Sequence, residues 1–455
     1  MAGEPSDRSE NKTAHKGKVP QDVGSFSHAR TPGAAVKLPK TRLVLLFLAA
    51  IGALIGLNSA LIRSSLPAIV SRAPLGDGHG VFMVFGFLGG AIGLERAVAY
   101  QAGSPAKPKW GFLAPAFAGV GSLLMIFEVS PLVSRETPIA PLAFMASNPQ
   151  MLPGLAWTLS MAALTGIYLG VWRRQQSVAV LIQLLGSFLG VCGIALWARG
   201  VDAQMLAPWW MAYLVLTIVG ERIELARVAF IAHNIEWLIF FSALAFSLTL
   251  GLCLLNPAIG YPAMGVTMGI MLLLAITHDT ARKTFKLKGV TGFMGTCMLV
   301  GYAWALLAAA VWIFSPTGFE GYWRDMAIHA LAIGFTMSMV AAHASMIIPS
   351  ITRRPMTYKP VLWVGWAVMQ LGLAVRLLGT TRASTLLWQW GDGISVAGML
   401  AMMVTVAALN IATSKKSAAS KATATATATD HSRAVHPEAS PHPKVTAPPK
   451  ASSQR

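Results

Sequence analysis

Two histidines in one apolar run are the strongest candidates for a ligand site in this sequence. His329 and His343 lie fourteen positions apart within residues 326–348. On an α-helix this spacing is roughly 21 Å along the axis and about 3.9 turns, so both imidazoles would point to nearly the same face. Membrane bundles bind haem or metal with side chains of facing helices. The pattern predicts one ligand imidazole near each membrane surface, both facing the same neighbours. Interhelical hydrogen bonding by each histidine is the alternative.

Three further histidines lie near the membrane portion, namely His79, His233 and His278. Histidine at membrane depth marks a candidate site, and groups of histidines at both surfaces are compatible with two ligand sets. With the orientation derived below, His79 opens the second helix and His329 lies in the first turn of the tenth, both on the outer side. His233, His278 and His343 fall on the inner side. His233 and His278 are close enough to water that an ordinary polar role is favoured for each.

Carboxylates and thioethers accompany the outer histidines. Asp325 precedes His329 by four residues, which is one helical turn, and Asp77 lies two residues before His79. A carboxylate beside an imidazole orients it and raises its basicity as a ligand. Four methionines offer thioethers to Cu(I), although methionine at helical spacing more often packs: Met83, Met337, Met339 and Met346.

A carboxylate next to an arginine occurs twice, as Glu95-Arg96 and as Glu221-Arg222 with Glu224. Adjacent helical residues do not face each other, so these side chains need partners on other helices. Cross-pairing between the two helices fits this need. A proton path through the carboxylates is the functional interpretation, and interhelical clamping is the favoured structural one.

These side chains are predicted to lie on membrane-spanning helices. Hydrophobic residues make up 55% of the 455-residue chain and charged residues only 12%, with a mean hydropathy of +0.58. Apolar runs of about 20 residues follow one another with short breaks, which predicts an all-α polytopic helical bundle in a lipid bilayer. The twelve predicted helices are 43–62, 80–99, 110–130, 152–171, 178–197, 207–226, 235–255, 260–278, 291–314, 326–348, 360–379 and 386–411.

Basic residues set the predicted orientation, because the loops after even-numbered helices are richer in Lys and Arg. The positive-inside rule then places both termini in the cytoplasm. Residues 1–40 and the Ala-, Thr-, Lys- and Pro-rich residues 413–455 are predicted to be disordered cytoplasmic tails around a membrane domain over 41–412. The formal charge of +18 favours anionic lipid headgroups over nucleic acid as a partner. The three cysteines form no CxxC motif, which excludes covalent c-type haem and thiolate zinc sites.

Two of these segments resemble the NnrS family of twelve-helix inner-membrane proteins. In that family the second helix opens His-Ala-His-Glu-Met-Leu-Phe-Gly-Phe, where this chain has His79-Gly-Val-Phe-Met-Val-Phe-Gly-Phe87. The family's later helix opens His-Ala-Leu-Thr and ends near Gly-His-Thr-Gly-Arg-Pro. Here His329-Ala-Leu opens the helix and Thr352, Arg354 and Pro355 close it. The matches cover about sixty residues, and two family histidines are replaced, by Val81 and Ile351.

The resemblance implies a membrane protein that contains haem b, with copper as a second metal, and that acts in the response to nitric oxide or in electron transfer with a redox partner protein. His79 and His329 match the family pattern and lie on the same predicted face at the starts of parallel helices. A bis-imidazole iron needs one histidine from each of two packed helices. We therefore expect His79 and His329 to form the principal site, with His343, His278 and His233 as further candidate ligands.

Two other classes of function remain open, and no residue is assigned as catalytic. Twelve helices interrupted by Gly and Pro with intramembrane charge are also typical of a secondary transporter or metal permease. Transporter sites lie at the midplane, whereas these charges and histidines lie near the two surfaces. A metal-free assembly partner of a nitrogen-oxide reductase is the third class. The sequence contains no nucleotide-binding loop, serine triad or zinc-hydrolase motif.

Overall fold

Twelve helices in the described part of the chain are long and apolar enough to cross a membrane. The computed structural model describes residues 39–106, 108–128, 149–226, 233–315 and 320–435. The twelve helices coincide with the twelve predicted ones to within a few residues. The prediction of an all-α polytopic membrane bundle is therefore confirmed.

The first six membrane-spanning segments, which we call spans, include a second span built from three consecutive helices. Their helices are α1 (Lys40–Arg63), α3 (His79–Val81) with η1 (Phe82–Gly89) and α4 (Gly90–Ala102), α5 (Leu113–Glu128), α7 (Met151–Arg174), α8 (Val178–Ala198) and α9 (Ala203–Ala226). The short helices α2 (Ala73–Asp77) and η2 (Trp110–Phe112) lie between them.

The last six spans include a tenth span that is also built from three consecutive helices. They are α10 (His233–Leu255), α11 (Pro257–His278), α13 (Gly289–Phe314), α14 (Gly321–His329) with η3 (Ala330–Met337) and α15 (Ser338–Thr352), α16 (Leu362–Thr381) and α17 (Thr385–Val435). The short α12 (Ala281–Thr284) precedes α13. We call the end of the bundle with Arg63, His79 and Gly321 the outer end and the opposite end the inner end, after the predicted orientation.

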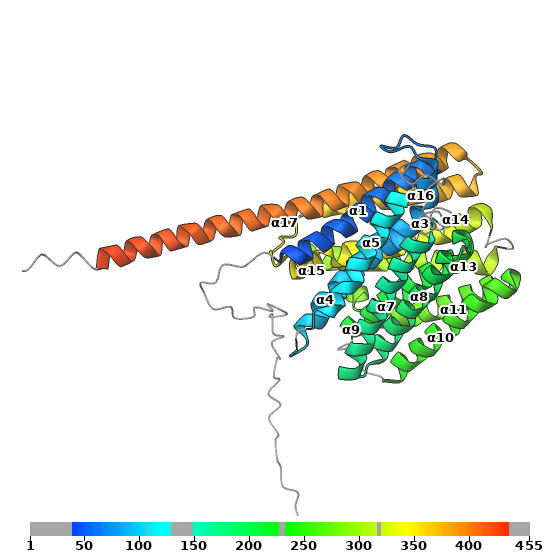
Figure 1. The fold of residues 1–455 in the computed structure, drawn as a ribbon, viewed down its shortest axis with the longest axis horizontal. Helices are drawn as coiled ribbons and strands as arrows, with labels where there is room; N and C mark the ends of the chain where they lie inside the picture. Colours follow the sequence, from blue (N-terminus) through cyan, green and yellow to red (C-terminus); the bar gives the residue numbers. More distant parts are fainter. Residues whose placement is uncertain (1–38, 107, 129–148, 227–232, 316–319, 436–455) are drawn as a thin grey trace, which may run out of the picture. The chain divides into compact units, whose positions relative to one another are not determined.

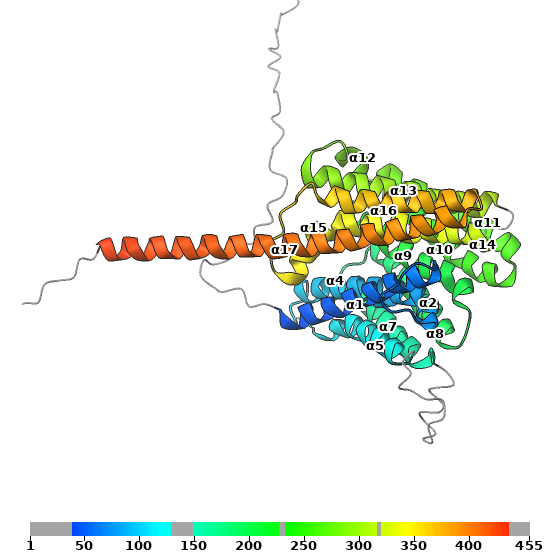
Figure 2. The same cartoon turned by 90° about the horizontal axis from the view of Figure 1, so that it is seen from above.

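The second and tenth spans lie where two groups of helices meet. Figure 2 shows α1, α5 and α7 on one side of the bundle and α11, α13 and α16 on the other. The second span packs on α1, α5 and α7, and the tenth packs on α13, α16 and α9. The two spans contact each other through α4 and α15, at the inner end. Figure 1 shows the bundle from the side, with α17 extending past the other helices.

Both of these spans contain an eight-residue π-helix. The π-helix η1 begins three residues after His79, and η3 begins directly after His329. π-Helical segments are rare and occur often at functional sites. Each candidate ligand therefore stands at the outer end of an unusual stretch of helix.

Glycines bring α1 and η1 into close contact. A Cβ atom added to Gly52 would lie 2.9 Å from the backbone carbon of Gly86, closer than real Cβ contacts allow. One turn further toward the outer end, a Cβ on Gly56 would lie 2.6 Å from the sulfur of Met83. The missing side chains let the two backbones approach, which sets the position of the Gly56 carbonyl beside the second span.

The last helix extends further than predicted. The sequence predicted a disordered tail from residue 413, but α17 continues as helix to Val435. The extension is rich in alanine, the residue with the highest helix propensity, and it continues an existing helix without a new nucleation step. The predicted N-terminal tail and the last twenty residues lie outside the described residues.

Candidate ligand site

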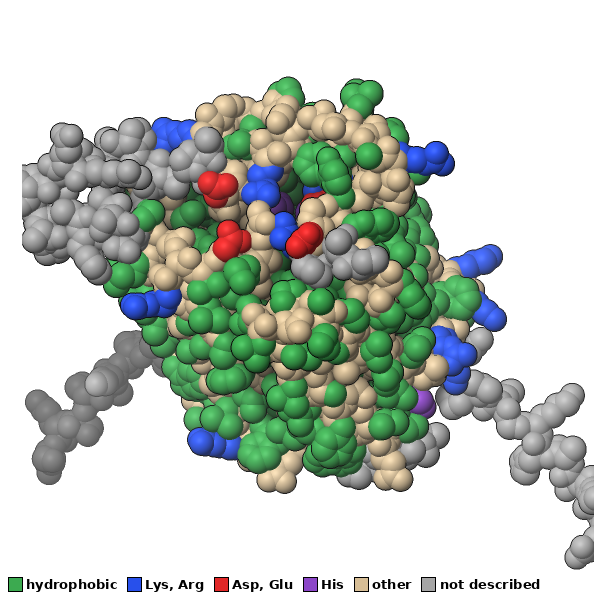
Figure 3. All heavy atoms as spheres, turned by 90° about the vertical axis from the view of Figure 1, so that its right-hand side faces the viewer, with side chains coloured by type: hydrophobic (Ala, Val, Ile, Leu, Met, Phe, Trp, Pro, Cys, Tyr) green, Lys and Arg blue, Asp and Glu red, His purple; other side chains and the backbone are tan. Residues whose placement is uncertain are grey.

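A cavity of about 420 Å³ lies at the outer end between the second and tenth spans. Its wall includes apolar side chains of η1, α9, η3 and α17 and a group of charged side chains near the mouth. Figure 3 shows acidic, basic and histidine side chains gathered in a hollow on this face. Pockets for small molecules and cofactors have volumes of roughly 300–1,000 Å³ and a mostly apolar lining with a few polar groups. This cavity has both properties.

His79 and His329 face each other across this cavity. Their ring centres are 6.4 Å apart and their planes differ by 10°. Face-to-face contact requires a separation of roughly 3.5–4.0 Å, so the rings do not stack on each other directly. Two imidazoles bound to one metal, with metal–nitrogen bonds of about 2.0–2.1 Å, have ring centres roughly 6 Å apart. The observed separation is compatible with one atom bound between them.

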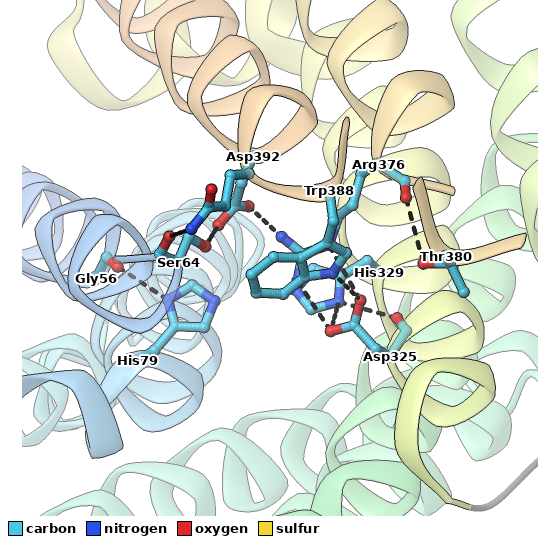
Figure 4. A network of polar contacts seen from close by, with 10 residues as sticks. Gly56, Ser64, His79, Asp325, His329, Arg376, Thr380, Trp388 and Asp392 are labelled. Carbon is cyan, nitrogen blue, oxygen red and sulfur yellow. Dashed lines mark hydrogen bonds and ion pairs between the residues drawn. The ribbon is translucent and has the colours of Figure 1, made fainter. Parts of the chain in front are cut away.

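The two histidines have the same tautomer, which hydrogen bonding determines. Nδ1 of His79 lies 2.9 Å from the carbonyl oxygen of Gly56, and Nδ1 of His329 lies 2.9 Å from that of Asp325. A carbonyl oxygen only accepts, so each Nδ1 carries the hydrogen, and each Nε2 of the neutral ring keeps its lone pair. Figure 4 shows the second nitrogen of His79 pointing away from Gly56. Both rings are therefore held in the form that binds a metal through Nε2.

Asp325 contacts His329 as the four-residue spacing predicts. Its Oδ1 lies 3.1 Å from Nδ1 of His329. The same carboxylate accepts hydrogen bonds from Nε and Nη2 of Arg376 at 3.1 and 2.9 Å, and from the indole of Trp388 at 3.1 Å. These bonds fix the carboxylate and so fix the His329 ring, which is the arrangement found behind metal-binding histidines.

A second carboxylate completes this outer network. Asp392 pairs with Arg376 and accepts a hydrogen bond from the Ser64 hydroxyl (Figure 4). Arg376 is only 4% exposed and lies between the two carboxylates, so one buried cation serves two anions. The network joins α1, α14, α16 and α17 around the mouth of the cavity.

The sequence reasoning missed most of this outer network. Arg376 and Asp392 are the single charges within two otherwise apolar runs, 362–381 and 385–411. An isolated charge in an apolar run indicates a buried partner or a site, so this signal was present. Ser64 and Trp388 carry no comparable signal, because serine and tryptophan are common at helix ends near a membrane surface.

His343 belongs to a different network at the inner end. Its Nδ1 lies 2.7 Å from the carbonyl oxygen of Met339, and its Nε2 lies 3.2 Å from Nη1 of Arg222. The guanidinium only donates, so Nε2 accepts and both ring nitrogens are in use. His343 is buried and has no lone pair free for a metal in this arrangement.

The prediction that His329 and His343 face the same neighbours is wrong. His329 faces Asp325 and the cavity, whereas His343 faces Arg222. The prediction assumed 3.6 residues per turn throughout, but the π-helix η3 lies between the two histidines and has more residues per turn. His329 is also not in the first turn of its helix, because α14 begins at Gly321.

The centre of the inner network is an ion pair between Arg222 and Asp279. Two guanidinium nitrogens donate to the two carboxylate oxygens at 3.0 and 2.7 Å. The Tyr302 hydroxyl and the backbone N–H of Ala281 donate to the same carboxylate at 3.0 and 2.8 Å. Burial acts to raise the pKa of Asp279, but these hydrogen bonds and the charge of Arg222 leave the pKa below its ordinary value.

The predicted cross-pairing of the second and sixth spans is present. Arg96 of α4 lies 3.0 Å from Glu221 and 3.5 Å from Glu224 of α9. Arg96 also pairs with its neighbour Glu95 at 2.5 Å, which the sequence reasoning did not expect. The long side chains bend toward each other, and one guanidinium gathers three carboxylates. These ion pairs join the second and sixth spans, as the structural interpretation of the sequence predicted.

Three candidate residues remain, namely Asp77, His278 and His233. Asp77 lines the cavity. Nδ1 of His278 donates to the carbonyl oxygen of Leu274 at 2.9 Å at the inner end of α11, away from the cavity. The side chain of His233 lies outside the described residues.

The donor set was tested against haem iron and against a bare metal ion. Among the described residues, no group of three or more His, Cys, Asp or Glu side chains is placed to hold a metal ion. Two imidazoles are sufficient for haem iron, whose other four ligands belong to the macrocycle. Four methionines also line the cavity and are soft enough for Cu(I): Met83, Met211, Met337 and Met399. The residues present therefore fit haem iron that the two histidines would hold, and they also fit Cu(I).

These observations define an integral membrane protein whose helical bundle carries a histidine-lined cavity open at one end. The family model of the domain of unknown function DUF8744 matches residues 42–411, so the chain belongs to this family. A search among curated proteins gives no match.

Proposed function

We propose that this protein binds haem b between His79 and His329 and takes part in the nitric oxide response or in electron transfer. The observation that carries the proposal is the facing pair of imidazoles, 6.4 Å apart, each with Nδ1 occupied by a carbonyl oxygen. The resemblance of the two histidine segments to the NnrS family points to the same group and to nitrogen-oxide chemistry. When bound, such a haem would supply one-electron chemistry, and nitric oxide would bind to the iron only by replacing one of the two histidines.

The chain's own residues would hold and insulate this group. Gly56 and Asp325 orient the two imidazoles, and Arg376 keeps Asp325 in place. Phe82 and Phe85 of η1 are fully buried and pack on Trp157, so the η1 side of the site is apolar. The indole Nε1 of Trp210 is buried in the cavity wall and has no hydrogen-bond partner among the described residues, so it can donate to a polar group of the ligand.

The orientation and location complete the proposal. The loops after even-numbered helices are rich in Lys and Arg, which supports an inner-membrane protein with both termini in the cytoplasm. In that orientation the cavity opens away from the cytoplasm. A redox partner on that side would reach His329 near the cavity mouth.

The test is a reduced-minus-oxidised absorption spectrum of the detergent-purified protein, with iron and copper measured on the same sample. We expect a b-type α-band with stoichiometric iron that shifts on addition of nitric oxide. His79→Ala and His329→Ala should each remove the band, whereas the matched change His343→Ala should leave it per folded molecule. Protein made with ample haem supply that shows neither band nor iron would refute haem binding. Stoichiometric copper without iron would assign the site to Cu(I).

A transporter or metal permease is the second candidate, and one observation favours it. The larger cavity opens at the outer end, and two ion-paired groups, Arg222–Asp279 and Arg96 with its three carboxylates, lie toward the inner end. A cavity open to one side with ion pairs on the other side is compatible with one state of alternating access. Copper uptake into proteoliposomes, lost in His79→Ala, would support this function over electron transfer.

A further inference from the structure

A line of polar side chains follows one face of α9 through the bundle. Its members are Trp210, Tyr213, Thr217, Glu221 and Glu224, at the three- and four-residue spacing that places side chains on one face of a helix. We call this line the α9 polar stripe. It covers roughly 20 Å along the axis at about 1.5 Å per residue. Of the twelve spans in the described residues, that of α9 has the largest buried share.

The middle of the stripe has polar atoms without partners. The hydroxyls of Tyr213 and Thr217 and the indole nitrogen of Trp210 are buried and have no hydrogen-bond partner among the described residues. The Tyr168 hydroxyl on α7, which is close enough to Tyr213 and Glu221 to interact electrostatically, has none either. Buried polar groups are nearly always satisfied by protein or by water, so a group of unsatisfied hydroxyls in one line indicates a hydrated path.

A cavity adjoins each end of the stripe. Trp210 lines the outer cavity beside His79. At the inner end, a second cavity of about 220 Å³ is lined by Arg96, Tyr168 and Glu224, and by residues at the exposed ends of α4 and α7. The hydroxyls of Tyr213 and Thr217 lie on α9 between the two cavities, and neither residue lines either cavity. The polar stripe therefore bridges the one part of this route that lies outside both cavities.

From this arrangement we infer that the α9 polar stripe conducts protons between the inner face and the outer cavity. Glu224 takes up protons at the inner cavity, and Glu221, Thr217, Tyr168 and Tyr213 relay them with intervening waters. Each hydroxyl accepts one proton and releases its own, so no group on the path changes its net charge after a proton has passed. The indole of Trp210 donates only and cannot relay, so water in the outer cavity receives the proton from Tyr213.

The Arg222 side of the same helix shows what a satisfied network looks like. Arg222, Asp279 and Tyr302 are bonded to one another, and each polar atom of the Asp279 carboxylate has a donor. None of these three residues lines either of the two cavities described above. A clamp that only joins helices needs no unsatisfied hydroxyls, and this contrast separates the α9 polar stripe from a structural network.

Proton flux into vesicles tests the inference, and the test does not require haem or copper to be bound. The purified protein is inserted into vesicles of phosphatidylcholine and phosphatidylglycerol that contain the pH dye pyranine. A valinomycin–potassium potential, negative inside, then drives protons inward. We expect acidification faster than in protein-free vesicles. Tyr213→Phe and Glu221→Gln should each lower the protein-dependent rate by about a hundredfold, the lower end of what a positioned proton-transfer group contributes.

Tyr261→Phe is the matched control, because Tyr261 is a buried tyrosine on α11 outside the stripe. It should conduct like the unmodified protein. All variants are compared at equal amounts of monodisperse protein with the same unfolding midpoint, and Thr217→Val replaces any variant that fails this condition. A protein-dependent rate that survives both stripe substitutions, or no protein-dependent rate at all, would overturn the inference. Because metal content is measured separately, loss of the haem proposal would leave this result intact.

Discussion

His329 and His343 lie in the same span and differ in what their second nitrogen meets. Each donates Nδ1–H to the carbonyl oxygen four residues earlier, at 2.9 and 2.7 Å. Nε2 of His343 then accepts from Arg222, whereas His329 lines a cavity with His79 on the other side. The same residue type with the same local hydrogen bond is a structural group in one place and a candidate ligand in the other. Only the neighbours from other helices decide which.

The two networks also use arginine differently. Arg222 makes a two-bond pair with one carboxylate, and Tyr302 and a backbone N–H occupy the rest of that carboxylate. Arg376 lies between two carboxylates, and one of them, Asp325, orients a candidate ligand. The inner pair stabilises the contact of the helices around it. The outer network stabilises the fold and also sets the geometry of the cavity.

The largest expected effect is on the inner network. Arg222→Met should lower the free energy of unfolding by about 3–5 kcal/mol, because it leaves the Asp279 carboxylate buried without its cation. Denaturant unfolding in detergent measures the change. The exposed Arg173→Met should change stability by no more than about 0.5 kcal/mol. If Arg222→Met lowered the free energy of unfolding no more than Arg173→Met does, the inner network would not have the stabilising role assigned to it here.

The next effect is on the outer network and concerns ligand affinity. Asp325→Asn should weaken haem binding by about 10–100-fold, as loss of a group behind a metal-bound histidine typically does. Titration of the haem-free protein with haemin measures the affinity. Asp202→Asn, at an exposed position of the same end, is the control and should bind as the unmodified protein does. If Asp325→Asn altered stability but not affinity, the two networks would both be structural.

The smallest expected effect is a decrease in the free energy of unfolding at acidic pH, caused by protonation of Asp279 in the inner network. The pKa of Asp279 lies below its ordinary value of 3.8, so the ionised form is favoured in the folded state. Its contribution to stability is complete above pH 3.8 and is lost as the pH falls below that value toward the folded-state pKa. The difference in unfolding free energy between the native chain and Asp279→Asn should therefore narrow below this pH. A constant difference would contradict the assigned direction.

Most of the fold could be predicted because membrane spans are recognisable from the hydrophobic composition of the sequence. All twelve predicted helices are present within a few residues, since a bilayer requires about 20 apolar residues for each crossing. The contact of Asp325 with His329 and the pairing of Arg96 with α9 also followed from spacing and charge. These features depend on local sequence or on the high cost of an unpaired charge in a membrane.

The rest of the site could not be predicted, because it depends on distances between helices and on departures from ideal helix geometry. The π-helices η1 and η3 have ordinary apolar sequences, so the residue count per turn could not be read from them. Their presence is the reason that His343 and His329 do not share neighbours. The extension of α17 to Val435 was also missed, since an Ala- and Lys-rich segment suits both a polar tail and a helix.

Composition and hydropathy were sufficient to predict the class of protein, its twelve helices and the polar residues that need partners inside a membrane. Which of these residues contact one another depends on the packing of the helices. This packing placed His79 opposite His329, left the hydroxyls of Tyr213 and Thr217 without a hydrogen-bond partner among the described residues, and paired His343 with Arg222. The physical reason is that helix formation depends on neighbours within one turn, whereas a site depends on the packing of helices far apart in the chain.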